Sequence, residues 1–204
     1  MEKITVGILI FDNVEVLDFT GPYEVFSVTR ELDKPDFTDP CPFEIIIVSE
    51  YLRKVKTMGG MRVIPNYNFE DFPSVDILIV PGGLGERLEH SNPIIHHFLK
   101  AQSKKVKTLA SVCTGAFFLA NAGIINGKRA TTHSLSLDRL EEGFPEIDVI
   151  RDKRYTEDGN IITSAGISAG IDMSLYIVSK YLGEEVARLT AREMGYPYPE
   201  NDDR

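Results

Sequence analysis

Unbroken apolar runs alternate along the chain with longer stretches of helical character. The runs are typical of strands buried on both faces and lie at residues 3–11, 43–49, 75–80 and 108–112, with a last short strand expected at 160–163. Helices are predicted over residues 17–30, 93–103, 116–120, 135–142, 170–182 and 184–194. Strands that alternate with helices predict a mostly parallel central sheet with helices on both faces, a flavodoxin-like three-layer α/β sandwich.

Shorter elements are expected between these main ones. Two short strands, at residues 55–57 and 61–64, flank Gly59-Gly60 and predict a hairpin. A short strand is also expected at 128–133, residues 148–151 with 155–158 are expected to form a strand and turn, and residues 33–42 form a loop rich in Pro and Asp. Because no repeat, low-complexity stretch or linker interrupts the chain, we expect one domain over residues 1–204.

Composition and charge exclude several classes of function. The net charge is −9 without a basic stripe, so nucleic acid is not an expected partner. No apolar run approaches the roughly 20 residues that cross a bilayer, so no membrane span is expected. The N-terminus has the pattern of a strand rather than a signal peptide, and two cysteines are too few for a small secreted scaffold. These features favour a cytoplasmic protein.

Residues 107–119, KTLASVCTGAFFL, predict a buried strand that turns sharply into a helix at Cys113. This is the arrangement of a nucleophile elbow. A helix N-terminus beside the thiol favours the thiolate, which is the reactive form. The alternative is that Cys113 is a small apolar core residue. Cys41, which lies between two prolines in a loop, is expected to have no catalytic role.

Several unusual segments fall at the predicted ends of strands, where ligands bind in parallel sheets. They are residues 12–18, 81–85, 113–115, 131–133 and 164–167. Their coincidence favours a functional Cys113. No metal or other cofactor is expected, because His90, His96 and His97 lack the spacing of a metal site with Cys or carboxylate partners.

Five motifs together resemble the ThiJ/PfpI superfamily, which has the class I glutamine amidotransferase-like fold. They are LDFTGPYEVF, VPGG, ASVCTGAFFLA, ATTH and TSAGISAGID, and the resemblance runs from Val6 to about Met194. Within the superfamily, Asp18 and Thr114 resemble the isonitrile hydratase branch and the amidotransferase-like domain of some AraC-type regulators. The resemblance also implies a homodimer.

Resemblance to isonitrile hydratases implies that water is added to a small isonitrile, R–N≡C, to give an N-substituted formamide. Cys113 is then the nucleophile and Asp18 the general acid and base. Asp18 must hold a proton at the first step, so we expect burial and the nearby sulfur to raise its pKa. A structural role as the N-cap of a helix is the alternative for Asp18.

The remaining candidate residues have two interpretations each. Thr114 hydrogen-bonds substrate or water, or it caps the elbow helix. Gly82 and Gly83 present backbone N–H groups to the reacting centre, or they only form a turn. His133 belongs to the pocket or is a structural histidine. By family analogy, Gly166 and Ile167 line the pocket.

Two other functions remain open at this stage. One is a stress or redox protein of the same superfamily, in which Cys113 is oxidised or acts on reactive carbonyls. The other is a non-enzymatic sensor domain, which in regulators is joined to a helix-turn-helix domain that we do not expect in a chain ending at Arg204. Peptidases of the PfpI type usually have His directly after the cysteine. Thr114 occupies this position here, so the resemblance disfavours peptidase activity. Glu24 is a weaker candidate acid than Asp18.

Overall fold

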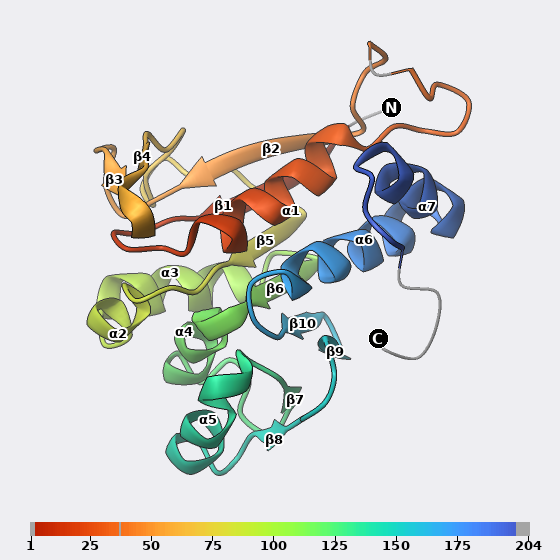
Figure 1. Cartoon of the computed structure of the whole chain (residues 1–204). Coiled ribbons are helices and arrows are strands. Elements are labelled where there is room, and N and C mark those ends of the chain that lie inside the picture. Colours follow the sequence, from red (N-terminus) through yellow and green to blue (C-terminus); the bar gives the residue numbers. More distant parts are fainter. Residues whose placement is uncertain (1–2, 37, 199–204) are drawn as a thin grey trace.

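The computed structural model describes residues 3–36 and 38–198, and its main feature is a six-stranded sheet (Figure 1). In spatial order the strands are β2 (Phe43–Val48), β1 (Ile4–Leu9), β5 (Ile77–Val80), β6 (Thr108–Val112), β10 (Ile161–Ser164) and β9 (Tyr155–Asp158). The first five are parallel, and β9 pairs antiparallel with β10 through a turn at Gly159. The central strands are mostly apolar because helices cover both of their faces.

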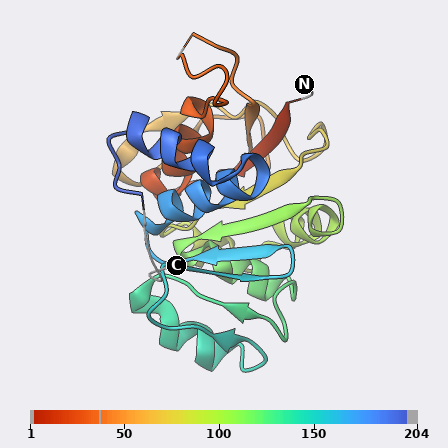
Figure 2. The same ribbon diagram turned by 90° about the vertical axis from the view of Figure 1, so that its right-hand side faces the viewer.

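Helices pack on both faces of this sheet (Figures 1 and 2). One group is α1 (Val16–Val28), α6 (Ala169–Leu182) and α7 (Glu184–Glu193), which contact one another. The opposite group contains α3 (Pro93–Ser103) and α4 (Ala116–Asn121). The predicted three-layer α/β sandwich with a mostly parallel sheet is therefore confirmed.

Small elements lie around the edges of the main sheet. The predicted hairpin is present as β3 (Val55–Lys56) and β4 (Arg62–Val63), joined by the short 3-10 helix η1 (Met58–Gly60). The strand β7 (Arg129–Ala130) pairs in parallel with β8 (Asp148–Val149), a pairing that the sequence pattern did not reveal. The 3-10 helix η3 (Ser134–Ser136) leads into α5 (Leu137–Gly143).

Two helices differ from the sequence prediction. Helix α1 begins at Val16, one residue before the predicted start, and Pro22 lies inside it. A proline at that position has no N–H to donate to the carbonyl of Asp18, one turn earlier. The short helix α2 (Glu86–Glu89) was not predicted, because four residues are too few to establish a period.

Within residues 3–36 and 38–198, no helix combines the length and the apolar character that a membrane crossing requires.

The packing of α1 on the sheet gives a first prediction. Phe26 is fully buried, and its ring centroid lies 5.0 Å from that of Phe43 at the start of β2. Phe26→Ala should lower the free energy of unfolding by about 3–5 kcal/mol, because it removes a large apolar group and leaves a cavity. Urea unfolding measures the change. Leu88→Ala, at a side chain that is 74% exposed, is the control and should stay within about 0.5 kcal/mol.

Candidate active site

The unusual segments at the strand ends meet beyond the C-terminal edge of the sheet. Glu15 N donates to Gly82 O at 2.9 Å, which joins the segment before α1 to the loop after β5. Cys113 N donates to Ala165 O at 3.1 Å, and Thr132 Oγ1 donates to Cys113 O at 2.8 Å. The elbow is thus tied to the segments that follow β7 and β10.

Cys113 occupies the sharp turn between β6 and the elbow helix α4. The turn is the 3-10 helix η2 (Cys113–Gly115), and Cys113 itself has a φ of 56°, in the left-handed region that residues with a side chain rarely adopt. Gly115 permits this close turn, because a Cβ there would lie 2.0 Å from Val80 O. The predicted strand–elbow–helix arrangement is confirmed. Cys113 is 6% exposed, so its thiol lies just beneath the surface.

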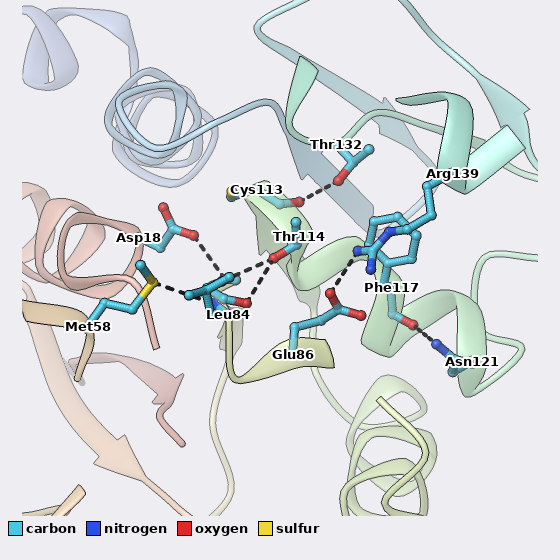
Figure 3. A network of polar contacts seen from close by, with 12 residues as sticks. Asp18, Met58, Leu84, Glu86, Cys113, Thr114, Phe117, Asn121, Thr132 and Arg139 are labelled. Carbon is cyan, nitrogen blue, oxygen red and sulfur yellow. Dashed lines mark hydrogen bonds and ion pairs between the residues drawn. The ribbon is translucent and has the colours of Figure 1, made fainter. Parts of the chain in front are cut away.

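Asp18 lies in the first turn of α1 with its carboxyl group completely buried. Gly82 N donates to Asp18 Oδ2 at 3.0 Å (Figure 3). Within the part of the chain that the structure describes, Oδ1 accepts no hydrogen bond. The side chain of Cys113 lies close enough to interact with this carboxyl group. Glu15, not Asp18, is the N-cap of α1, so capping does not explain Asp18.

The surroundings of Asp18 raise its pKa to about 7. Burial is the largest cause, since it disfavours the charged carboxylate, and the charge of Glu15 adds to it. The hydrogen bonds from Gly82 N–H and from the Cys113 side chain act in the opposite direction. The expected rise is present, but the sulfur lowers the pKa instead of raising it, because the thiol donates to the carboxylate.

The expectation of a resting thiolate at Cys113 is wrong. Burial, followed by the charge of Asp18, raises the pKa of the thiol to about 12. The backbone N–H groups of Thr114 and Ile167 donate to the sulfur and lower the pKa, as a helix N-terminus would, but they do not outweigh burial. Cys113 therefore keeps its proton at neutral pH, and Asp18 is the nearby group that can accept it.

Gly82 and Gly83 do not present free N–H groups to the reacting centre. Gly82 N–H is bound to Asp18, and Gly83 N–H donates to Thr114 Oγ1 at 3.0 Å. A Cβ at Gly82 would lie 2.5 Å from both the N and Oγ1 of Thr114, so only glycine fits between the two segments. The hydroxyl of Thr114 thus holds the loop after β5, which is neither of the two roles predicted for it.

The other predicted pocket residues form a second side of the site. His133 Nδ1 accepts from Leu135 N at 3.2 Å, so the histidine has the structural role of capping the turn after it. Gly166 lies under the imidazole ring, and a Cβ there would be 2.4 Å from His133 Cδ2. Ile167 has a φ of 41°, which is unusual for a β-branched residue, and its N–H is directed at the Cys113 sulfur.

Residues expected to lie apart from the site do so. Glu24 is exposed, on the outer side of α1. Cys41 is half-buried near the opposite end of α1, where its thiol donates to Phe26 O at 3.2 Å. No group of three or more His, Cys or carboxylate side chains among the described residues is arranged to hold a metal ion.

Sequence reasoning did not identify Ile167 N–H as a donor to the sulfur or Asp18 as the acceptor of Gly82 N–H. The N–H groups that face the sulfur come from Thr114 and Ile167, and the N–H that holds Asp18 comes from Gly82. Backbone donors carry no residue-type signal. The cluster of small residues at each strand end was the only available indication of them.

A mostly parallel α/β sandwich with a cysteine elbow and a buried carboxyl group beside it defines the class of this protein. The model of the DJ-1/PfpI family matches residues 4–180, and the chain belongs to this family, also called ThiJ/PfpI. A ThiJ/PfpI family protein from Pseudomonas syringae has a similar crystal structure, with a TM-score of 0.84 and 27% identity, covering 99% of this chain and 79% of the other.

Two curated relatives have different functions. Isonitrile hydratase from Pseudomonas putida is 34% identical over 201 residues, which are 98% of this chain and 82% of the relative. The HTH-type transcriptional regulator GbdR from Pseudomonas aeruginosa is 27% identical over 183 residues, or 90% of this chain. The matched region is 48% of the regulator, so the chain spans about half of that relative.

The raised pKa of Asp18 makes a prediction about stability. A pKa near 7 in the folded protein and about 3.9 in the unfolded chain means that the folded state binds the proton more tightly between these values. The free energy of unfolding should therefore fall as the pH rises from about 4 to about 7. Asp18→Asn should remove this dependence and stabilise the protein at pH 8 by up to about 4 kcal/mol.

Urea unfolding between pH 4 and pH 8 tests this effect. Asp71→Asn changes an exposed carboxyl group in the same way and should leave the pH dependence as it is in the unaltered chain. An Asp18→Asn variant that is less stable than the unaltered chain at pH 8 would contradict a destabilising, buried charge at this position.

Proposed function

We propose that this protein is an isonitrile hydratase-like enzyme that adds water to R–N≡C and releases R–NH–CHO. The observation that carries the proposal is the burial of one carboxyl group, Asp18, next to the elbow cysteine, which raises its pKa to about 7. A group with a pKa near the working pH serves equally well as acid and as base. Identity of 34% to an isonitrile hydratase over 98% of the chain supports the same reaction.

In the first proposed step, the Asp18 carboxylate takes the thiol proton as the Cys113 sulfur attacks the terminal carbon of the isonitrile. Asp18 then returns this proton to the same carbon, which gives the thioimidate R–N=CH–S–Cys113. The N–H groups of Thr114 and Ile167 stabilise the charge that develops on sulfur during the transfer.

In the second step, Asp18 acts as a base and activates water, which adds to the thioimidate carbon. Asp18 passes the proton to the substrate nitrogen, and the adduct is R–NH–CH(OH)–S–Cys113. Breakage of the C–S bond releases the formamide, and the hydroxyl proton returns to the sulfur through Asp18. One water is consumed and the enzyme is restored, so no cofactor is needed.

The high pKa of Cys113 argues against the redox alternative. Oxidation to sulfenic acid requires the thiolate, and oxidant-sensing cysteines have a low pKa and are accessible. Here burial raises the pKa of the thiol to about 12, and only 6% of the residue is exposed. We further propose that the enzyme acts on a small molecule and is a homodimer, as the family resemblance implies, and that it is cytoplasmic, as the N-terminal pattern and the two cysteines favour.

Turnover of a simple alkyl isonitrile by the purified protein tests the proposal directly. Loss of isonitrile and appearance of the formamide are expected for the unaltered chain. Cys113→Ala should abolish turnover without unfolding the protein, because one small side chain replaces another. Cys41→Ala is the matched control and should keep full activity. Activity that survives in Cys113→Ala would show that the nucleophile has been misplaced.

The acid–base role of Asp18 has its own test. Asp18→Asn should lower kcat by about 10²–10⁴-fold, the usual contribution of general acid–base catalysis. The asparagine can still accept the hydrogen bond from Gly82, so the loss reflects proton transfer and not geometry. Asp18→Glu should retain part of the activity if the site has room for one more methylene. Full activity in Asp18→Asn would contradict the mechanism even if Cys113 proved essential.

A further inference from the structure

An ion pair with a buried carboxylate lies beside the elbow, outside the residues that take part in the proposed chemistry. Glu86, the first residue of α2, is 1% exposed, and its Oε2 accepts from Arg139 Nη2 of α5 at 2.7 Å. The guanidinium carbon of Arg139 is 3.5 Å from the centroid of the Phe117 ring in the elbow helix α4. Figure 3 shows the carboxylate and the guanidinium directed at each other beside that ring.

This pair is not an efficient source of stability. The Glu86 carboxylate is buried, whereas the Arg139 side chain is 33% exposed. Burial of the carboxylate costs free energy that its attraction to the guanidinium repays only with good geometry and full hydrogen bonding. Among the described residues, Glu86 Oε1 and Arg139 Nε have no hydrogen-bond partner, so the pair is held by a single bond. An apolar or neutral pair of similar size would therefore serve stability as well.

The position of the pair suggests a different role. Glu86 follows directly after the loop of residues 81–85, and its N–H donates back to Gly83 O at 3.1 Å. Through Gly82 N–H the loop holds Asp18, and through Gly83 N–H it holds Thr114, the residue next to the nucleophile. This loop is thus the bridge between the proposed acid and the proposed nucleophile. Its far end is fixed to α4 and α5 by the ion pair.

We propose that Glu86 and Arg139 are positioning residues, whose ion pair, together with the packing of Arg139 on Phe117, fixes the loop of residues 81–85 against the elbow helix. With the pair intact, the two loop N–H groups keep Asp18 and Thr114 at their hydrogen-bonding distances. This inference rests on the proposed roles of Cys113 and Asp18, although its test does not depend on isonitrile turnover.

Loss of the pair should change the reactivity of Cys113 in a defined direction. A looser loop weakens the bond from Gly82 to Asp18, and this raises the pKa of the carboxyl group. It also loosens Thr114, whose N–H lowers the pKa of the thiol. Glu15 is the other charged group that acts on Asp18. Its carboxylate accepts from Val16 N, and among the described residues it forms no hydrogen bond or ion pair with Glu86 or Arg139. Both pKa values should therefore rise together.

The test is the rate at which iodoacetamide alkylates Cys113 between pH 6 and pH 10, in a Cys41→Ser background. Glu86→Gln and Arg139→Met should each move the profile upward by at least about half a pH unit, which is about threefold slower alkylation at pH 8. The double variant should show no larger shift than the stronger single one, because the two residues act as a unit. Arg139→Lys, which keeps the charge, should restore part of the rate.

Two controls separate positioning from general destabilisation. Arg139→Met leaves Glu86 buried without its partner and lowers the melting temperature, but Glu86→Gln and the double variant should melt close to the unaltered chain. Arg151→Gln breaks the exposed ion pairs that Arg151 makes with Asp138 and Glu141 of α5, and it should leave the alkylation profile unchanged. An unchanged profile in Glu86→Gln and in the double variant would overturn the inference.

Isonitrile turnover is measured in parallel. The three pair variants should lower kcat about tenfold with little change in KM, because the loop acts on proton transfer and not on substrate binding. If the unaltered chain turns over no isonitrile, the proposed function fails, while the alkylation profiles still decide the role of the pair. If turnover is present but the alkylation profiles coincide, only the positioning role fails.

Discussion

The site depends on one hydrogen bond, from the N–H of Gly82 to the carboxylate of Asp18. Without it the carboxyl group would be buried with no donor of fixed geometry, and its pKa would rise further above about 7. The same loop also binds Thr114 through the next N–H. One short turn after β5 therefore sets both the orientation of the proposed acid, Asp18, and the position of the residue beside the proposed nucleophile, Cys113.

Burial has opposite uses for the two titratable groups. It suits Asp18 to the proposed proton transfer, because it moves the pKa of the carboxylic acid into the neutral range. It makes Cys113 a poor resting nucleophile, because it moves the pKa of the thiol away from that range. A protonated thiol and a partly ionised carboxylate are complementary in the proposed mechanism. The carboxylate can take the thiol proton at the moment when the sulfur attacks the substrate.

The sheet and the location of the site were predictable from the sequence, and the reasons are physical. Strands buried on both faces give unbroken apolar runs, and glycines and polar residues at their ends reveal where chain segments approach closely, as at Gly82 and Gly115. The protonation state of Cys113 was not predictable. It depends on how completely residues distant in sequence cover the thiol. The N–H at the start of the elbow lowers the pKa of the thiol, as expected, but burial raises it by more.

Helix α2 and the role of Glu86 were also beyond sequence reasoning. A glutamate after a glycine-rich turn has the pattern of a solvated surface residue, and only the approach of Arg139, 53 positions later, buries it. The contact of the Thr114 hydroxyl with Gly83 was not foreseen for the same reason, since Gly83 lies 31 positions earlier. Contacts of this kind leave no periodic signal in either segment.

The shallow burial of Cys113 has a consequence for selectivity. With 6% of the residue exposed, a reagent must pass close to the surrounding chain to reach the sulfur. An isonitrile carries its reacting carbon at the tip of a linear, unbranched group, whereas a carbonyl or maleimide carbon is flanked by substituents. We therefore expect the reactivity of Cys113 to depend on the shape of a reagent around its reacting atom more strongly than that of a fully exposed cysteine would.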